Sequence, residues 1–411
     1  MESKNVIAAI ALSSAVIVLY SLFFAPEKPI TNKNLAEKNK IEQNTDTPSL
    51  DKKEIQIQIS REDALKQSER IKFENQKIIG SISLKGASID DLTFKDYNTT
   101  LESNENVTLL GPRNTENGYL IESGFVTSDK NVDIPNSDSV WSVIGNNKLT
   151  NNSPIKLSWT NNQGIKFEKE ISLDDKYLFT INQSVTNTTD KKYDFYSYGQ
   201  IIRNKIPDIS NFYILHEGLI ATLDDELIEE DYDDIQEKKF TKTSQKGWLG
   251  ISDKYWITSL IPASGKEFKT TFDYKKKFRA NFIATQPLEL KEKSRVEEKL
   301  QIIVAAKRVD IIDGYANSLN IDKFDLVIDW GFLYFITKPL FFGIDYFFKL
   351  LGNYGLAIIA ITICIRLTFF PLANFSFRSM AKMKALQPEM VRLKELHKDD
   401  KMKLQQEMMA L

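Results

Sequence analysis

The chain has 411 residues, 54 of them basic and 56 acidic, so its formal net charge is −2. This balance gives no indication of a nucleic-acid partner, and we expect no DNA binding. The single cysteine, Cys364, excludes an intrachain disulfide, and the sequence contains no G-x-x-x-x-G-K-[ST] loop of the kind that binds ATP phosphates.

Residues 6–25 form the first candidate membrane segment, VIAAIALSSAVIVLYSLFFA. A helix of this length crosses a hydrocarbon core of ~30 Å. A cleaved signal peptide is the alternative, but the exit Phe23–Pro26 is a poor cleavage site. We therefore expect an uncleaved anchor, with residues 1–5 in the cytoplasm because Lys4 gives a weak positive-inside bias.

Residues 26–53 are rich in Lys, Asn, Glu, Pro and Thr, which predicts a flexible linker. From residue 54 the pattern changes to the period of a strand: Ile55, Ile57 and Ile59 alternate with polar residues.

Short β-type runs continue from there to residue 325. Residues 70–97 read as strand, turn, strand, with Gly80 and Gly86 as turn positions. Further runs lie at 165–172, 177–185, 194–202, 268–274, 278–285 and 299–306. Many short strands without long amphipathic helices predict a large antiparallel β-sandwich over residues 54–325.

The predicted β domain offers little material for catalysis. Its one histidine is His216, and it has no G-x-S-x-G, H-E-x-x-H or zinc-ligand spacing. We therefore interpret it as a binding or scaffolding module. The aromatic segment 246–256, KGWLGISDKYW, could be a ligand platform, but buried packing beside a turn is favoured.

Residues 329–350, DWGFLYFITKPLFFGIDYFFKL, are mostly apolar, yet Lys338, Asp345 and Lys349 fall on one helical face. The segment could span the membrane or lie in its interface. An internal proline and glycine weaken a straight span, and a span here would place the basic C-terminal tract outside. We expect an interfacial amphipathic helix with its polar stripe toward headgroups and water.

Residues 355–373 form the second predicted membrane helix, which contains Arg366. An arginine inside a span costs roughly 2.5–3.5 kcal/mol. Its side chain could reach up to the headgroups, or it could line a water-filled cavity together with Thr362, one turn earlier on the same face. The residues alone do not decide between the two.

Residues 374–411 carry eight basic and five acidic residues, which fits a cytoplasmic location. An apolar stripe follows helical spacing at Met383, Leu386, Met390 and Leu393. Pro388 suggests a fresh helix start, and 397–400 interrupts the stripe, so we predict an amphipathic helical hairpin. It could be a small coiled coil or meet RNA or anionic lipid. The stripe continues to residue 411 without a cap, and we expect further membrane helices beyond it.

The stretch 353–411 closely resembles the bacterial YidC insertase family, whose relatives include the mitochondrial and chloroplast insertases. The resemblance rests on NYGLAIIAITICIRLTFFPL, SMAKMKALQPEM and KDDKMKLQQEMMAL. Looser matches upstream are SISLKGASIDDLTFKDY, KGWLGISDKYW and VAAKRVDIIDGY. In the last of these the family usually has a Gly-Pro pair where this chain has Ala305-Ala306.

The resemblance implies a multi-pass protein of the bacterial inner membrane, of Gram-negative type, that inserts and folds newly made membrane proteins. It implies a periplasmic β-supersandwich similar to sugar mutarotases but without their catalysis, no cofactor, and a hydrophilic groove with an arginine matching Arg366. The implied partners are nascent membrane proteins, lipid, the Sec translocon with its auxiliary subunits, and ribosomes or targeting factors at the cytoplasmic hairpin.

Two other functions fit the same order of segments. A two-span sensor would have an anchor, a periplasmic ligand domain and a cytoplasmic coiled coil, but it gives no reason for Arg366. A membrane-anchored carbohydrate-binding protein or carbohydrate-modifying enzyme would need a polar cluster in the β domain that the sequence does not reveal.

Overall fold

The structure is a computed structural model of the chain, which describes residues 58–207, 216–331, 333–396 and 402. The expected cytoplasmic N-terminus, the first membrane helix at 6–25 and the linker at 26–53 lie outside these residues, as do Ile55 and Ile57.

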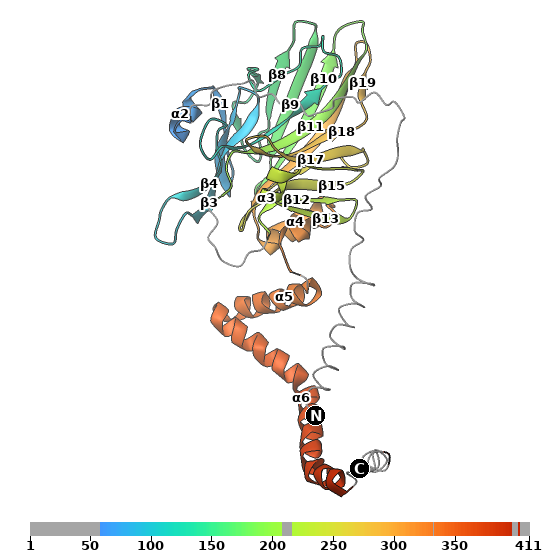
Figure 1. Cartoon of the computed structure of the whole chain (residues 1–411). Helices are drawn as coiled ribbons and strands as arrows, with labels where there is room; N and C mark the ends of the chain where they lie inside the picture. Colours follow the sequence, from blue (N-terminus) through green and yellow to red (C-terminus); the bar gives the residue numbers. More distant parts are fainter. Residues whose placement is uncertain (1–57, 208–215, 332, 397–401, 403–411) are drawn as a thin grey trace. The chain divides into compact units, whose positions relative to one another are not determined.

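Two β-sheets make up most of the described chain before residue 307 (Figure 1). In order across the larger sheet, the strands are β14 (Phe240–Ser244), β17 (Phe268–Tyr274), β18 (Phe278–Ala284), β11 (Tyr193–Arg203), β5 (Tyr119–Val126), β3 (Ser88–Asn98), β2 (Ile78–Ser83), β1 (Arg70–Glu74) and β7 (Lys148–Leu149), with β19 (Leu288–Leu290) beside β11 and β4 (Asn106–Leu110) beside β3.

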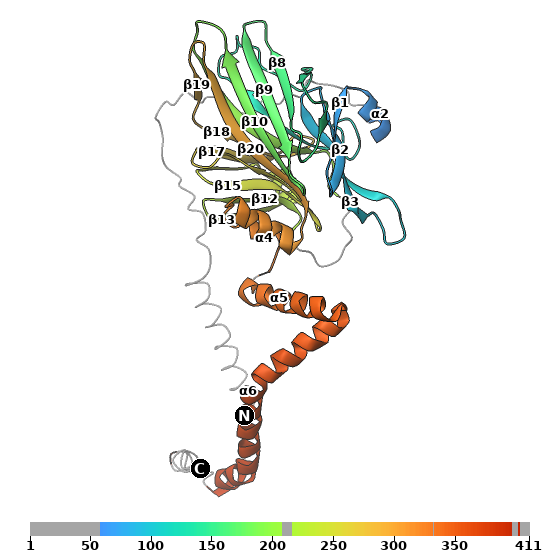
Figure 2. The ribbon, with the colours of Figure 1, turned by 180° about the vertical axis from the view of Figure 1, so that it is seen from behind.

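The smaller sheet has the order β13 (Glu226–Asp231), β12 (Gly218–Leu223), β15 (Gly247–Ser252), β16 (Trp256–Ile261), β20 (Arg295–Ala306), β10 (Leu178–Asn187), β9 (Ile165–Leu173), β8 (Ile155–Thr160) and β6 (Ser142–Ile144). Figure 2 shows β8, β9, β10 and β20 side by side. Every strand pair in the two sheets is antiparallel except β1 with β7.

The hydrophobic core lies between the two sheets. Most strands contribute residues to it. In β18, for example, the alternate residues Phe278, Ala280 and Phe282 belong to this core. The ring of Phe73 in β1 meets that of Phe179 in β10 edge-on, with centroids 5.2 Å apart. The predicted antiparallel β-sandwich is therefore confirmed.

All six predicted β-type runs from residue 165 onward are strands, but two predictions near the start of the domain are wrong. Ile59 is not in a strand, because Ser60 accepts a bond from the Asp63 amide and begins helix α2 (Arg61–Lys66). Gly80 is inside β2 and makes no turn. A Cβ there would lie 2.0 Å from the carbonyl oxygen of Asp91 on β3, so glycine permits a close approach of two backbones.

The aromatic segment 246–256 packs into the domain, as favoured from the sequence. Trp248 is fully buried and meets Phe324 edge-on at 5.1 Å between centroids. Trp256 stacks on Phe94 at 4.6 Å. The first pair links the smaller sheet to the residues that follow its last strand, and the second links the two sheets.

Helix α4 (Val309–Ser318), which the sequence did not predict, follows the last strand directly. Its Tyr315 hydroxyl donates to Asp174 Oδ2 at 2.7 Å and accepts from the Tyr177 amide at 2.8 Å. These bonds attach α4 to the start of β10. Two short elements complete the domain: α3 (Tyr232–Glu237) and the 3₁₀ helix η1 (Phe324–Val327).

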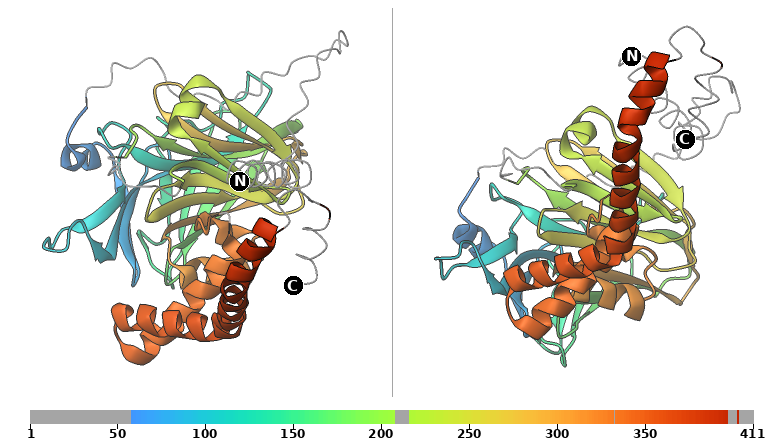
Figure 3. Two further views of the ribbon diagram at one scale, coloured as in Figure 1. Left: turned by 60° about the horizontal axis from the view of Figure 1, so that its bottom comes forward. Right: turned by 90° about the horizontal axis from the view of Figure 1, so that it is seen from below.

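Two long helices end the described chain: α5 (Tyr334–Leu351) and α6 (Tyr354–Leu396). Figure 3 shows the tight turn between them. The fresh helix start predicted near Pro388 is wrong, because α6 continues through both Pro371 and Pro388. The predicted membrane span 355–373 lies within α6, and its bounds stay a prediction.

A proline removes one backbone hydrogen bond and crowds the preceding turn, so it can bend a helix without ending it. The ribbon of α6 bends along its length (Figure 1). Residues 397–401 and 403–411, where the hairpin was predicted to turn and return, lie outside the described residues.

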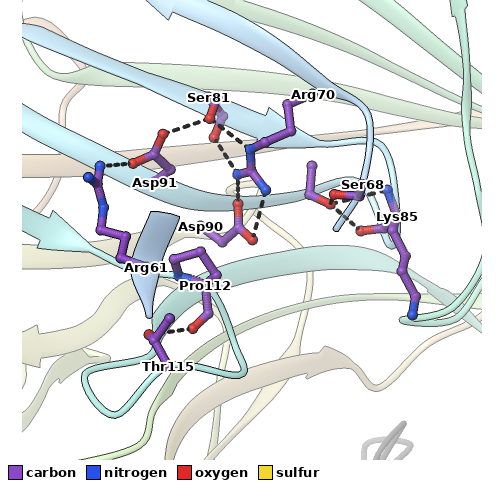
Figure 4. Close-up of polar contacts among 10 residues, drawn as sticks. Arg61, Ser68, Arg70, Ser81, Lys85, Asp90, Asp91, Pro112 and Thr115 are labelled. Carbon is purple, nitrogen blue, oxygen red and sulfur yellow. Dashed lines mark hydrogen bonds and ion pairs between the residues drawn. The ribbon is translucent and has the colours of Figure 1, made fainter. Parts of the chain in front are cut away.

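Charged side chains connect α2 to the edge of the larger sheet (Figure 4). Arg70 on β1 donates to Ser81 Oγ at 2.8 Å and forms an ion pair with Asp90. Ser81 in turn donates to Asp91 at 2.6 Å, and Asp91 pairs with Arg61 of α2. Burial raises the pKa of Asp90, although Arg70 opposes that shift.

Candidate functional site

Helix α6 is, within the part of the chain that the structure describes, the one helix long and apolar enough to cross a membrane. Its apolar side chains are exposed around the helix, including Ile358, Ile359 and Phe370, each more than half exposed. A helix that is apolar on all sides is either buried in a core or surrounded by lipid. Because α6 is almost entirely exposed, the second environment fits it.

Arg366 and Thr362, the two predicted groove residues, lie four residues apart on α6 and therefore on one face. Both are exposed. The Thr362 hydroxyl donates to the Ile358 carbonyl at 2.7 Å, which satisfies its donor within the helix. Arg366 has no ion-pair partner among the described residues, so its charge is available to another molecule. The groove itself stays a prediction.

The start of α6 is positioned by α5. Gly352 ends α5 with a φ of +67°, a left-handed conformation that favours glycine. The rings of Phe348 and Tyr354 stack across the turn, 3.9 Å between centroids and 14° apart. Further along, a Cβ on Gly343 would lie 2.8 Å from Ile361 Cδ1, so glycine allows the two helices to pack closely here.

Lys338 joins α5 to the β domain. Its ammonium lies 2.8 Å from Asp325 of η1 and 3.5 Å from Asp313 of α4, and 5.6 Å from the ring centre of Trp330. Burial lowers the pKa of Lys338, but the two aspartates outweigh it and hold that pKa above its ordinary value. We call Lys338, Asp313 and Asp325 the joint.

The joint corrects the prediction that Lys338, Asp345 and Lys349 form one stripe toward headgroups. Lys349 pairs with Asp345 on its own helix at 2.7 Å, whereas Lys338 turns to the β domain. Helical spacing alone could not reveal the contacts of Lys338 with the β domain, because α4, which carries Asp313, was not predicted. The excess of aspartate at 310–329 was the available signal.

The β domain contains one histidine, His216, whose Nδ1 lies 3.2 Å from Asp231 on the edge strand β13. Among the described residues, no group of three or more His, Cys, Asp or Glu side chains could hold a metal ion.

Two family models match the chain: "YidC periplasmic domain" over residues 70–342 and "60Kd inner membrane protein" over residues 346–411. The chain is 71% identical to a membrane protein insertase YidC of Pelagibacter ubique, over all of this chain and 74% of that protein. It is 40% identical to the corresponding insertase of Rickettsia prowazekii, over 99% of this chain and 74% of that protein.

Among solved structures, a galactose mutarotase-related enzyme from Lactobacillus acidophilus matches 58% of this chain and 97% of its own, at 12% identity and a TM-score of 0.43. The matches to the insertases, by contrast, run through both the β domain and the helices at high identity. The chain belongs to the YidC family of membrane protein insertases, which is an inner-membrane family and not a class of enzymes.

Proposed function

We propose that Arg366 and Thr362 line a hydrophilic groove, open to cytoplasm and lipid, through which this insertase passes polar segments of its substrates. The observation that carries the proposal is Arg366: a positively charged side chain in the one described helix that is long and apolar enough to cross a membrane, with no ion-pair partner among the described residues. Such a charge costs roughly 2.5–3.5 kcal/mol in a span, which water in a groove would offset.

The proposed mechanism rests on solvation and charge. A polar segment entering hydrocarbon loses its hydrogen bonds to water, and this loss is the main barrier to translocation. A wet groove in the inner leaflet shortens the dry path, and Arg366 attracts acidic residues of the arriving segment. Partition of the substrate's hydrophobic helix into lipid then provides the driving force.

The proposed topology is a multi-pass one in the bacterial inner membrane. Residues 1–5 are cytoplasmic, 6–25 span, 26–53 link, and 54–325 form the periplasmic domain. The predicted segment 329–350, which overlaps α5 (Tyr334–Leu351), lies in the periplasmic interface, 355–373 span, and 374–411 are cytoplasmic. The apolar exposure of both helices and the basic excess after residue 374 support this order.

The proposed partners are nascent membrane proteins, the surrounding lipid, the Sec translocon with its auxiliary subunits, and ribosomes or targeting factors that meet the cytoplasmic tract. The support for the last is charge: four lysines and arginines of α6 beyond the predicted span, namely Arg378, Lys382, Lys384 and Arg392, are exposed.

The test reverses the charge in the groove. We expect Arg366→Glu to reduce insertion of a substrate with an acidic translocated tail at least tenfold in cells depleted of their own insertase. A substrate whose tail carries no charge should lose much less. Protease protection of the tail gives the measurement.

Lys299→Glu is the matched control, because it makes the same charge change on an exposed residue of β20, outside both the proposed groove and the basic tract of α6. Insertion of the acidic-tailed substrate at the unmodified rate in Arg366→Glu would refute the charge-attraction mechanism. Equal losses in both variants would mean that the total charge of the chain, and no groove residue, sets the rate.

A further inference from the structure

A small cavity of about 20 Å³ lies between the two sheets of the β domain, away from the helices. Lys169 of β9 and Gln183 of β10 line it from the smaller sheet, and Ser123 of β5 lines it from the larger one. Trp141, just before β6, also lines it. Its volume suffices for one or two water-sized groups.

Lys169 is placed there by strand alternation. Phe167 and Ile171, two residues to either side of it in β9, are core residues, so Lys169 also points between the sheets. Its side chain is almost completely buried. Burial lowers the pKa of Lys169 to about 8, although Glu122 opposes that shift, so the amine is still mostly protonated at neutral pH.

The polar groups around Lys169 lack partners. The ammonium donates one hydrogen bond, to the Ser123 carbonyl at 2.7 Å, and lies 5.1 Å from the ring centre of Trp141. An ammonium has three donors, so two are unused. The Trp141 indole nitrogen, the Ser123 hydroxyl and Gln183 Oε1 are buried without a partner among the described residues. Native proteins leave few such groups unpaired.

Donors outnumber acceptors in this set. Lys169 offers two N–H groups and Trp141 one, while Gln183 Oε1 is the single pure acceptor and Ser123 can act either way. A lone water could satisfy part of this set, but an anion matches both the donor excess and the buried positive charge.

Two carboxylates also line the cavity, and both are engaged elsewhere. Glu122 pairs with Arg113 and accepts from Gln200 at 2.8 Å. Glu168 pairs with Lys166 at 2.8 Å and with Arg295 at 3.4 Å. The charge of Lys169 is therefore the least compensated one at the cavity.

We propose that this cavity is a binding site for a small carboxylate of formate size, held by Lys169, Trp141 and Ser123. The site is separate from the insertion groove and belongs to the β domain alone. Its ligand would complete the hydrogen bonding of a buried polar cluster that the two sheets leave unsatisfied.

The experiment observes Trp141 directly. The full chain in detergent micelles, labelled with ¹⁵N-tryptophan, gives one indole N–H signal for each of its five tryptophans. Trp141→Phe assigns the relevant signal. Sodium formate is then titrated at constant ionic strength against sodium sulfate, whose anion is too large for the cavity. We expect a saturable shift of the Trp141 signal and little change in the other four.

Lys169→Met should weaken formate binding at least tenfold, because it keeps the aliphatic stem and removes the charge. Lys299→Met, an exposed lysine of β20 in the same sheet, should bind formate as the unmodified chain does. The four remaining indole signals report whether each variant is folded. A Trp141 signal that does not saturate in the unmodified chain, or that shifts equally in Lys169→Met, would show that the cavity holds water only.

Discussion

Single residues in the β domain place charge in the interior of the protein. The side chains of Lys169, Arg70 and Asp90 are each about nine-tenths buried or more. A buried pair is expensive to form from two hydrated ions, but removing one partner is worse, because the other charge is then left alone. Removing the charge of Arg70 should lower the stability of the domain, because Asp90 loses its partner, whereas removing the uncompensated charge of Lys169 should raise it.

Arg70→Met should destabilise the domain by about 3–5 kcal/mol, because it strands the Asp90 carboxylate and removes a donor to Ser81. Denaturant unfolding followed by tryptophan fluorescence measures the change. Lys72→Met on the same strand is the control, since that lysine is exposed. Stability of Arg70→Met within about 0.5 kcal/mol of the control would contradict the expectation.

Lys169→Met should stabilise the domain at neutral pH in buffers without small carboxylates. In the folded protein the pKa of Lys169 is about 8, against an ordinary value of 10.5. Between these two pH values the unfolded chain holds a proton that the folded chain lacks, so the stability of the unmodified protein rises with pH.

The gain from Lys169→Met should therefore be about 3 kcal/mol below pH 8 and vanish near pH 10.5. Denaturant midpoints of both proteins at pH 7 and pH 10.5 measure it. A difference that does not change with pH would assign the effect to packing.

Elements differ in how far the sequence reveals them. Strands β9, β17 and β20 could be predicted, because short runs rich in β-branched and aromatic residues between turn residues favour strands whatever the topology. Helix α4 did not, because its ten residues are too few for a clear helical period and its anchor, Tyr315, is bonded to residues more than 130 positions away. The continuity of α6 through Pro388 was missed for a different reason: a proline is a weak stop signal where strong helix formers, such as Leu386 and Met390, flank it on both sides.

The residues around the candidate site also differ in whether the sequence reveals them. A charge inside an apolar run is visible in sequence, so Arg366 and its helical neighbour Thr362 could be named. The joint around Lys338 could not, since its aspartates come from elements whose mutual placement depends on the completed domain.

Lys338→Met should loosen α5 from the β domain. Losing two charged contacts of a side chain that is 21% exposed should reduce the free energy of local opening by about 1–2 kcal/mol. Amide hydrogen exchange in η1 and the first turns of α5 should then become roughly tenfold faster. Lys349→Met, which loses only a contact within α5, is the control. Unchanged exchange in Lys338→Met would mean that the apolar contacts of Trp330, and not the charges of the joint, hold α5 against the β domain.

At the scale of the whole molecule, the described chain has two parts. The β-sandwich has its own hydrophobic core, whereas the helices α5 and α6 have almost no buried residues. Of the residues in α5 and α6, only Ala357 is buried. Water would not tolerate so much exposed apolar surface on a monomer, so the helices depend on lipid or on other membrane segments for their environment. The sandwich needs neither.

The unbroken course of α6 has a mechanical consequence. From Arg366 the helix continues for 30 further residues to Leu396, with its backbone hydrogen bonds interrupted only at Pro371 and Pro388. A helix resists twisting about its own axis far more than a loop does. A ribosome or targeting factor that binds the basic end and rotates it would therefore also rotate Arg366 about the helix axis. The direction in which the guanidinium faces would then depend on a partner bound tens of ångströms away.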